Sequence, residues 1–138
     1  MQTIHPTSSY QIELPDGFRT DEDRHVSSFW LPDDPLVLQL SSYLRLEGEQ
    51  VDALTRLNLR MEGSSSPWQL IERRLNDGPS LDEAAGEQTD GEGNRWIHAF
   101  LVWPHFFIYV TLIGPEHIDW RSDNWGFEAI RTIAPIVH

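Results

Sequence analysis

Hydrophobic and polar residues alternate with a period of two in several short segments of the chain, which is the pattern of half-buried β-strands. Residues 95–113 are the most apolar of these segments, and the break at Trp103, Pro104 and His105 predicts two strands joined by a tight turn. Because Pro104 and His105 interrupt it, the segment does not have the pattern of a membrane-spanning helix. We therefore expect it to be the central hairpin of a sheet that the rest of the chain covers.

The same alternation predicts further strands on both sides of this hairpin. Residues 36–46 have the clearest pattern, because the leucines at 36, 38, 40, 44 and 46 fall on one face. Residues 20–23 have the composition of an acidic loop. The Ala and Glu content of residues 81–88 favours a helix, but their place between two turns favours an edge strand, which we choose. The remaining predicted strands are 10–14, 25–31 and 68–75.

Two segments have the period of an amphipathic helix. In residues 49–61, one stripe holds Val51, Leu54, Leu57 and Met61, with Glu49 and Asp52 in the first turn. The last helix has Ser122 as its N-cap and is ended by Pro135, and its apolar face holds Phe127, Ile130, Ile133 and Ala134. The order of elements predicts a single α+β domain over residues 1–138, with a mostly antiparallel sheet of about six or seven strands packed with two main helices.

Charge narrows the class of partner. The chain has 22 acidic residues against 10 arginines and no lysine, which gives a net charge of −12. Phosphate groups are bound by basic side chains, so nucleic acid and anionic membrane surfaces are excluded as partners and a basic protein is favoured. There is no cysteine, and the N-terminus has neither the basic start nor the apolar run of a secretory signal, so we expect a cytoplasmic protein.

Catalytic and cofactor motifs are missing from the sequence. There is no G-x-S-x-G, no cysteine nucleophile and no lysine for a Schiff base. The Gly91-x-Gly93 pair lacks the third glycine of a dinucleotide loop, and residues 119–128 fail the calcium-loop pattern because Asn124 takes the place of the required glycine. Spacing alone selects no pair of carboxylates for glycoside hydrolysis. We therefore predict no enzymatic activity and no cofactor.

Histidines provide the alternative to a pure binding function. His98, His105 and His117 lie in the apolar half of the chain, and Asp119 follows two residues after His117. Imidazoles and a carboxylate are ligands that a zinc or iron site can use. His98 is predicted to share a strand face with Trp96 and Phe100, and a packed, hydrogen-bonded histidine explains that position without a metal. A small enzyme or metal-binding protein that uses these four residues is thus the competing hypothesis.

Clustered acidic side chains are the strongest remaining signal. Each of them alone is a solubilising surface residue, but as a set they can steer a basic partner and raise its association rate. Affinity requires buried anchors, and tryptophan is favoured at such positions. Trp30, Trp68, Trp103 and Trp125 are the candidates beside loops. The predicted partner-binding set is Asp33, Asp34, Asp82, Glu83, Glu87, Asp90, Glu92, Trp103 and His105.

The layout resembles a known fold family. The opening Y-Q-I-E-L-P-D-G-F, the helix after the third strand, the Asn-Asp-Gly-Pro turn at 76–79, the hairpin and the short C-terminal helix look like the PsbP-like α/β/α sandwich. Within that fold, the chain is most similar to small bacterial proteins encoded beside secreted toxins, including the effector-associated chaperones of type VI secretion. The resemblance implies protein binding without catalysis. An immunity protein would bind a folded toxin through acidic loops, whereas a chaperone would grip an apolar segment of its effector in a groove.

Overall fold

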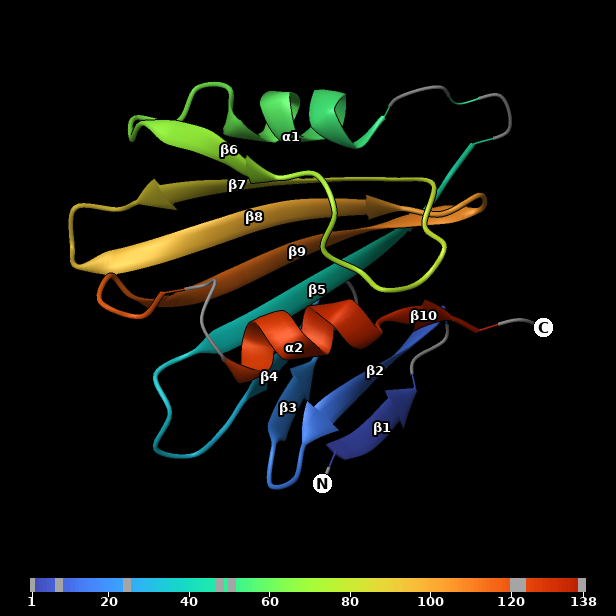
Figure 1. Ribbon diagram of the computed structural model, residues 1–138, viewed down its shortest axis with the longest axis horizontal. Coiled ribbons are helices and arrows are strands. Elements are labelled where there is room, and N and C mark those ends of the chain that lie inside the picture. Colours follow the sequence, from blue (N-terminus) through green and yellow to red (C-terminus); the bar gives the residue numbers. More distant parts are fainter. Residues whose placement is uncertain are drawn as a thin grey trace.

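The computed structural model describes residues 2–6, 9–23, 26–46, 49, 52–119 and 124–136. Within these residues the chain alternates strands with two short helices (Figure 1). The elements, in chain order, are β1 (Gln2–Pro6), β2 (Tyr10–Pro15), β3 (Arg19–Glu22), β4 (Ser27–Trp30), β5 (Val37–Leu44), α1 (Ala53–Met61), β6 (Trp68–Glu72), β7 (Asp82–Thr89), β8 (Asn94–Val102), β9 (Phe106–Pro115), α2 (Trp125–Thr132) and β10 (Ala134–Pro135).

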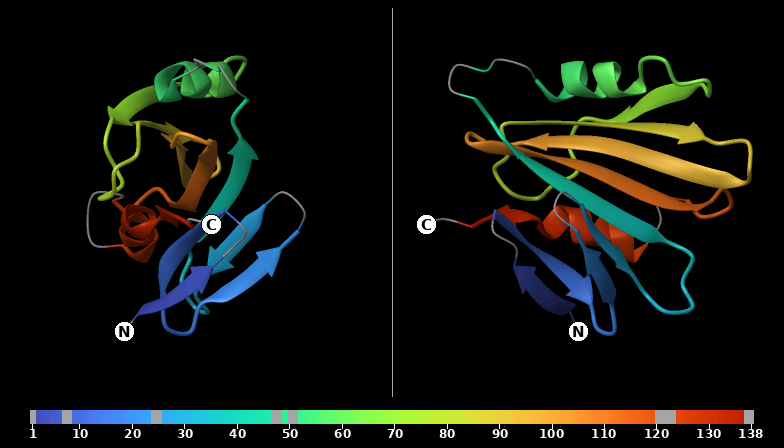
Figure 2. Two further views of the ribbon diagram at one scale, coloured as in Figure 1. Left: turned by 90° about the vertical axis from the view of Figure 1, so that its right-hand side faces the viewer. Right: turned by 180° about the vertical axis from the view of Figure 1, so that it is seen from behind.

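Seven of the strands form one antiparallel sheet in the spatial order β3-β4-β5-β9-β8-β7-β6. A second, smaller sheet consists of β2 with β1 on one side and β10 on the other. The two helices pack against this sheet structure, so the fold is α+β and mostly antiparallel sheet, as the sequence predicts. In the left view of Figure 2, strands of the large sheet lie between α1 at the top and α2 below it.

The hairpin predicted in residues 95–113 is confirmed as β8 and β9, which lie at the centre of the large sheet. The two strands pair along their whole length, and β9 pairs with β5 on its other side. The backbone N–H of Trp103 donates to the carbonyl oxygen of Phe106 at 2.9 Å and closes the turn. The dense β-branched and aromatic residues of this segment favour extended backbone, which accounts for the length of both strands.

Alternation along the central strands separates two apolar layers. Leu38 of β5, Leu101 of β8 and Val110 of β9 are buried on one face, where α2 and β2 cover them. Ile130 of α2 and Ile12 of β2 complete this layer, which is the main core. On the opposite face a smaller cluster lies beneath α1.

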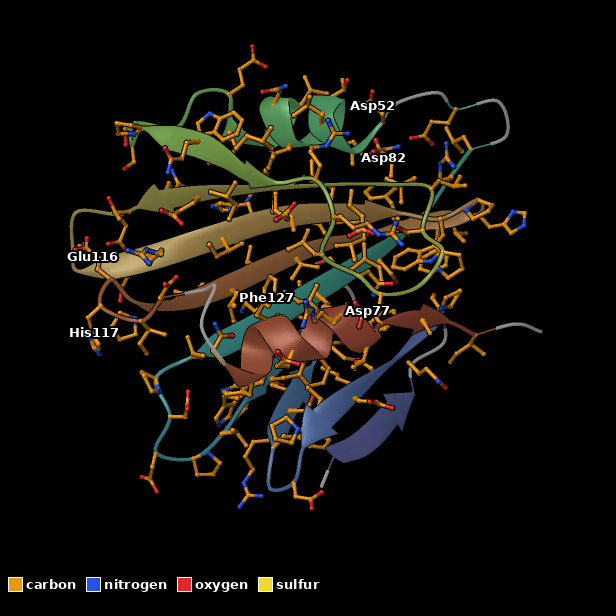
Figure 3. The ribbon with its side chains drawn as sticks, viewed as in Figure 1. Asp52, Asp77, Asp82, Glu116, His117 and Phe127 are labelled. Atoms are coloured by element: carbon orange, nitrogen blue, oxygen red, sulfur yellow. The ribbon has the colours of Figure 1, made fainter. Side chains whose placement is uncertain are left out.

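The smaller layer depends on a close approach between α1 and the sheet. Leu57 of α1 packs with Ala84 of β7 and Phe100 of β8. A Cβ atom at Gly86 would lie 2.8 Å from the ring of Trp68 and 3.4 Å from Leu57, so only glycine fits between β6 and the helix. At its start, α1 is fixed to β7, because the Asp82 carboxylate accepts the backbone N–H of Ala53 at 2.9 Å (Figure 3).

Several predicted elements differ from those observed. Residues 20–22 of the predicted acidic loop belong to β3, which pairs with β4. The four residues of β3 are exposed at the sheet edge, where charged side chains discourage further pairing. The strand predicted in residues 81–88 is observed as β7. It is not an edge strand, because β6 pairs with the side of β7 that faces away from β8. The first helix starts at Ala53 rather than at residue 49, with Asp52 as its N-cap.

The ends of two other predicted elements, the strand over residues 36–46 and the last helix, also differ from those observed. Leu44 and Leu46 are exposed, at 83% and 78%, because β4 pairs with β5 only as far as Leu40 and the core face is left uncovered beyond it within the described part of the chain. Ser122 lies outside the described residues, as do His25 and Val51, and the N-cap of α2 is Asn124. Ala134, predicted on the helix face, instead pairs with β2 as part of β10.

Candidate functional site: an arginine-lined aromatic groove

The predicted partner-binding residues do not form one surface. The register of β5, β8 and β9 places the β4–β5 loop, the β7–β8 loop and the segment after β9 at one end of the sheet. Asp33, Asp90 and Glu92 lie at that end of the sheet, as does Glu116, which Figure 3 labels. Asp34, another member of the predicted set, also lies at this end, in the β4–β5 loop. The other members, Asp82, Glu83, Trp103 and His105, lie toward the opposite end, and Glu87 lies between the two within β7.

Two members of the set are buried and therefore unavailable to a partner. Glu83 is 1% exposed, and its carboxylate accepts the backbone N–H groups of Leu75 at 2.6 Å and Asn76 at 2.8 Å. Trp103 is 2% exposed and stacks on Phe106 with 5.1 Å between ring centroids. Burial overturns the prediction for both residues, because composition and position beside a loop do not show which side chains point into the core.

Other acidic members hold the local structure together. Asp34 accepts the backbone N–H of Leu36 and the indole N–H of Trp125. Asp90 accepts the backbone N–H of Glu92 and the indole N–H of Trp96, and these bonds lower the pKa of Asp90 to about 2. Their carboxylates shape two loops, and the exposed side chains Asp33 and Glu92 remain the acidic groups that those loops display.

The histidine group of the metal hypothesis is not brought together. His98 lies within β8, His105 lies in the turn before β9, and His117 lies after the far end of β9. A ten-residue strand separates His105 from His117, which is about 30 Å at the usual rise per residue. The described residues contain no cluster of three or more metal-ligating side chains. Both His105 and His117 are exposed.

A groove on the α1 face of the sheet is a concave feature that the sequence did not predict. It has a volume of about 740 Å³, which is within the range of ligand-binding clefts. The groove forms because α1 lies over β7 and β8, whereas among the described elements no helix lies over the same face of β5 and β9. It is lined by Tyr43 of β5, Phe107 and Tyr109 of β9, and Arg56, Leu59 and Arg60 of α1, among others.

Aromatic rings form the floor of this groove. Tyr43 stacks on Phe107 across the β5–β9 pair, with 5.1 Å between ring centroids, and Phe100 stacks on Tyr109 across the β8–β9 pair at 4.9 Å. Cross-strand aromatic pairs of this kind stabilise the sheet. Tyr43 is 46% exposed and Leu59 is 61% exposed, so an apolar surface remains open to a ligand.

Arginines line the α1 side of the groove. The guanidinium carbon of Arg56 lies 3.7 Å from the centroid of the Phe107 ring, and Arg56 also forms an ion pair with Glu49. Burial, together with the neighbouring charge of Arg45, lowers the pKa of Arg56. Arg60 lies 5.2 Å from the centroid of Tyr109 and donates its Nε–H to the Tyr109 hydroxyl at 3.0 Å. Glu49 therefore neutralises Arg56, and Arg60 is the exposed arginine in the lining of the groove.

The Tyr109 hydroxyl links Arg60 to the buried imidazole of His98. The Gln88 amide nitrogen donates to Ser64, so its carbonyl oxygen faces His98 Nε2 at 2.8 Å. A carbonyl oxygen only accepts, which places the ring proton on Nε2 and leaves Nδ1 to accept the Tyr109 O–H at 2.7 Å. Burial lowers the pKa of His98 to about 4, and the positive charge of Arg60 adds to this effect, so the imidazole is neutral near pH 7.

Sequence reasoning missed this groove, although part of its signal is present. Arg56 and Arg60 are four residues apart on one helix face, and Phe107 and Tyr109 are two apart on one strand face. The sequence patterns do not show that these two faces meet. Among the described residues, no helix is long and apolar enough to cross a membrane.

Comparison with known proteins supports the fold. No family model and no curated protein matches the chain. Among solved structures, a Bacteroides thetaiotaomicron VPI-5482 protein, whose crystal structure was determined at 1.50 Å resolution, matches with a TM-score of 0.65 and 18% identity. The match covers 99% of this chain and 48% of that protein, so the chain spans about half the length of this neighbour. At this identity the likeness shows the fold alone.

Proposed function

We propose that the chain is a non-catalytic binding domain that holds a segment of a partner protein in the groove beside α1. The observation that carries this proposal is an apolar surface that stays open, with Tyr43 46% exposed and Leu59 61% exposed in a space of about 740 Å³. Exposed apolar side chains around a cleft are the usual mark of a protein-binding surface. An open strand face next to a helix also accommodates either an extended or a helical segment.

The biological role that fits this geometry is that of a cytoplasmic chaperone for a secreted bacterial effector, within the PsbP-like group. A chaperone of this kind binds an apolar segment of its client and requires no catalytic residues. The α+β architecture agrees with that assignment, and the groove provides the apolar contact surface that it requires.

An immunity protein for a basic toxin is the second candidate, and a different observation favours it. Three loops lie at one end of the sheet and display the exposed side chains of Asp33, Glu92 and Glu116. Such an acidic end would steer a basic partner, and the association rate would fall as salt is added. Binding in the groove would depend less on salt because it rests on apolar contact.

Site-specific photo-crosslinking in cells of the source organism separates the two candidates. A photoreactive phenylalanine analogue is placed at Leu59 in the groove, at Leu81 as a control, or at Glu92 in the acidic end. Leu59 and Leu81 are matched, since each is 61% exposed, and Leu81 does not line the groove. Protein adducts are identified by mass spectrometry.

The groove proposal predicts one protein adduct from Leu59 that is absent from Leu81. An adduct from Glu92 alone would favour the immunity role and contradict the chaperone role. If the three positions yield the same adducts, or none, the chain does not bind a partner through either surface and both roles are refuted.

A further inference from the structure

We infer that Arg60 binds a carboxylate of the segment that occupies the groove, and that this segment carries one acidic residue between apolar side chains. The inference rests on the proposed function and adds the chemistry of the ligand to it. It depends on how the hydrogen-bonding groups of Arg60 are used in the structure.

Arg60 is the exposed cation of the groove. None of the described carboxylates forms an ion pair with it, whereas Arg56 is paired with Glu49. Its Nε–H is bound to the Tyr109 hydroxyl, which leaves the two terminal nitrogens for a ligand. These two nitrogens match the two oxygens of a carboxylate, so a bidentate pair can form without breaking the bond to Tyr109.

Arg60 is also held in position before a ligand arrives. Its guanidinium lies beside the Tyr109 ring and is bound to the hydroxyl of the same residue. The hydroxyl proton of Tyr109 is committed to Nδ1 of His98, so the hydroxyl oxygen accepts from Arg60. Tyr109 and His98 are therefore positioning residues, and less side-chain entropy is lost when Arg60 binds an anion.

The surroundings limit the ligand to one acidic group. Glu62 lines the same groove and would repel a second carboxylate. Tyr43, Leu59 and Phe107 line the same groove as Arg60 and provide apolar surface that suits hydrophobic neighbours of the acid. A highly acidic or phosphorylated segment would also be repelled by the overall charge of −12.

Two short capped peptides provide the test. One contains phenylalanine, glutamate and leucine in sequence between serine and glycine residues, and its twin has glutamine in place of glutamate. Binding is followed by NMR through the Nε–H signal of Arg60 and the ring signals of Tyr109 and His98. The wild-type protein should bind the glutamate peptide about tenfold more tightly than the glutamine peptide, which is the effect of one charge-assisted bidentate pair.

Variants then identify the residue responsible. Arg60→Gln should abolish the preference and leave the affinity for the glutamine peptide unchanged. Arg131→Gln is the matched control, since Arg131 is also a helical arginine that lies over an aromatic ring, Phe127, but on α2. It should retain the tenfold preference. Tyr109→Phe keeps the ring but removes the hydroxyl and should reduce the preference to about threefold, because Arg60 remains charged but is no longer fixed.

The outcomes separate this inference from the proposed function. Equal affinity of the wild-type protein for both peptides, or an undiminished preference in Arg60→Gln, would overturn the role of Arg60 while leaving a groove that binds segments. If neither peptide shifts the groove signals while Leu59 still yields its crosslink, the acidic segment is again refuted and the proposed function stands. If the Leu59 crosslink is missing as well, both fail.

Discussion

Replacement of Glu83 tests whether this acidic residue holds the fold together or binds a partner. Its buried carboxylate accepts the backbone N–H groups of Leu75 and Asn76, and it also bonds the Ser80 hydroxyl. The side chain of Asn76 in turn donates to the carbonyl oxygens of Ile130 and Ile133 at the end of α2. Loss of the carboxylate should therefore loosen the loop that fastens α2 to the sheet.

The size of the effect follows from the bonds that are lost. Glu83→Ala leaves two buried N–H groups without their acceptor, at about 1–3 kcal/mol each, so we expect the free energy of unfolding to fall by about 2–6 kcal/mol. Glu83→Gln keeps one acceptor oxygen but loses the charge, and we expect a loss of about 1–2 kcal/mol. The ion pair with Arg74 adds little, because the Arg74 side chain is 53% exposed.

Urea unfolding followed by tryptophan fluorescence measures these differences through the transition midpoints. Glu87→Gln is the matched control, because Glu87 lies four residues further along β7 on the same face and its carboxylate makes no hydrogen bond among the described residues. It should stay within about 0.5 kcal/mol of the wild-type protein. Equal midpoints for all the variants, or a loss of partner binding in Glu83→Gln without a loss of stability, would refute the structural role of Glu83.

Three further predictions concern the core and its pH dependence. Because the folded-state pKa of His98 is about 4, against 6.5 for the free side chain, the unfolded state takes up a proton first as the pH falls. Stability should therefore be complete above about pH 6.5 and decline by at most about 3 kcal/mol towards pH 4, and urea midpoints of His98→Gln should lack this part of the slope. Gly86→Ala should lower the free energy of unfolding by about 1–3 kcal/mol in the same assay, since its new methyl group would meet the ring of Trp68. An unchanged midpoint would show that Trp68 and α1 can move to make room for the methyl group. Leu40→Ala should lower the free energy of unfolding by about 2–5 kcal/mol, whereas Leu44→Ala on the same strand face should change it by less than about 0.5 kcal/mol. Equal effects of the two substitutions would contradict the observed burial.

Local sequence patterns predicted the strands well where other parts of the protein pack on both faces of the strand. The hairpin of β8 and β9 was identified from its density of aromatic and β-branched residues and from the break at Pro104. The α+β class followed from the order of elements. The edge strand β3 was missed, because an exposed edge needs no apolar face and its sequence R-T-D-E resembles a loop.

Site residues were less predictable than strands. Asp33 and Glu92 do lie exposed at one end of the sheet, but Glu83 was grouped with them although it is buried. In β7, residues 83 and 87 have the same side-chain type and fall on the same face. What distinguishes them is that residues 75–80 fold back over Glu83, and this depends on contacts between distant parts of the chain.

The sequence by itself determined the period of each strand and helix, the overall charge and the missing catalytic motifs, because these depend on neighbouring residues and composition. Only the tertiary structure decided which faces are covered. The placement of α1 over β7 and β8 created the groove and brought Arg60 to Tyr109, 49 residues further along the chain. The physical reason is that the order of strands in a sheet follows from long-range pairing, whereas the patterns within one segment are the same whichever neighbour it has.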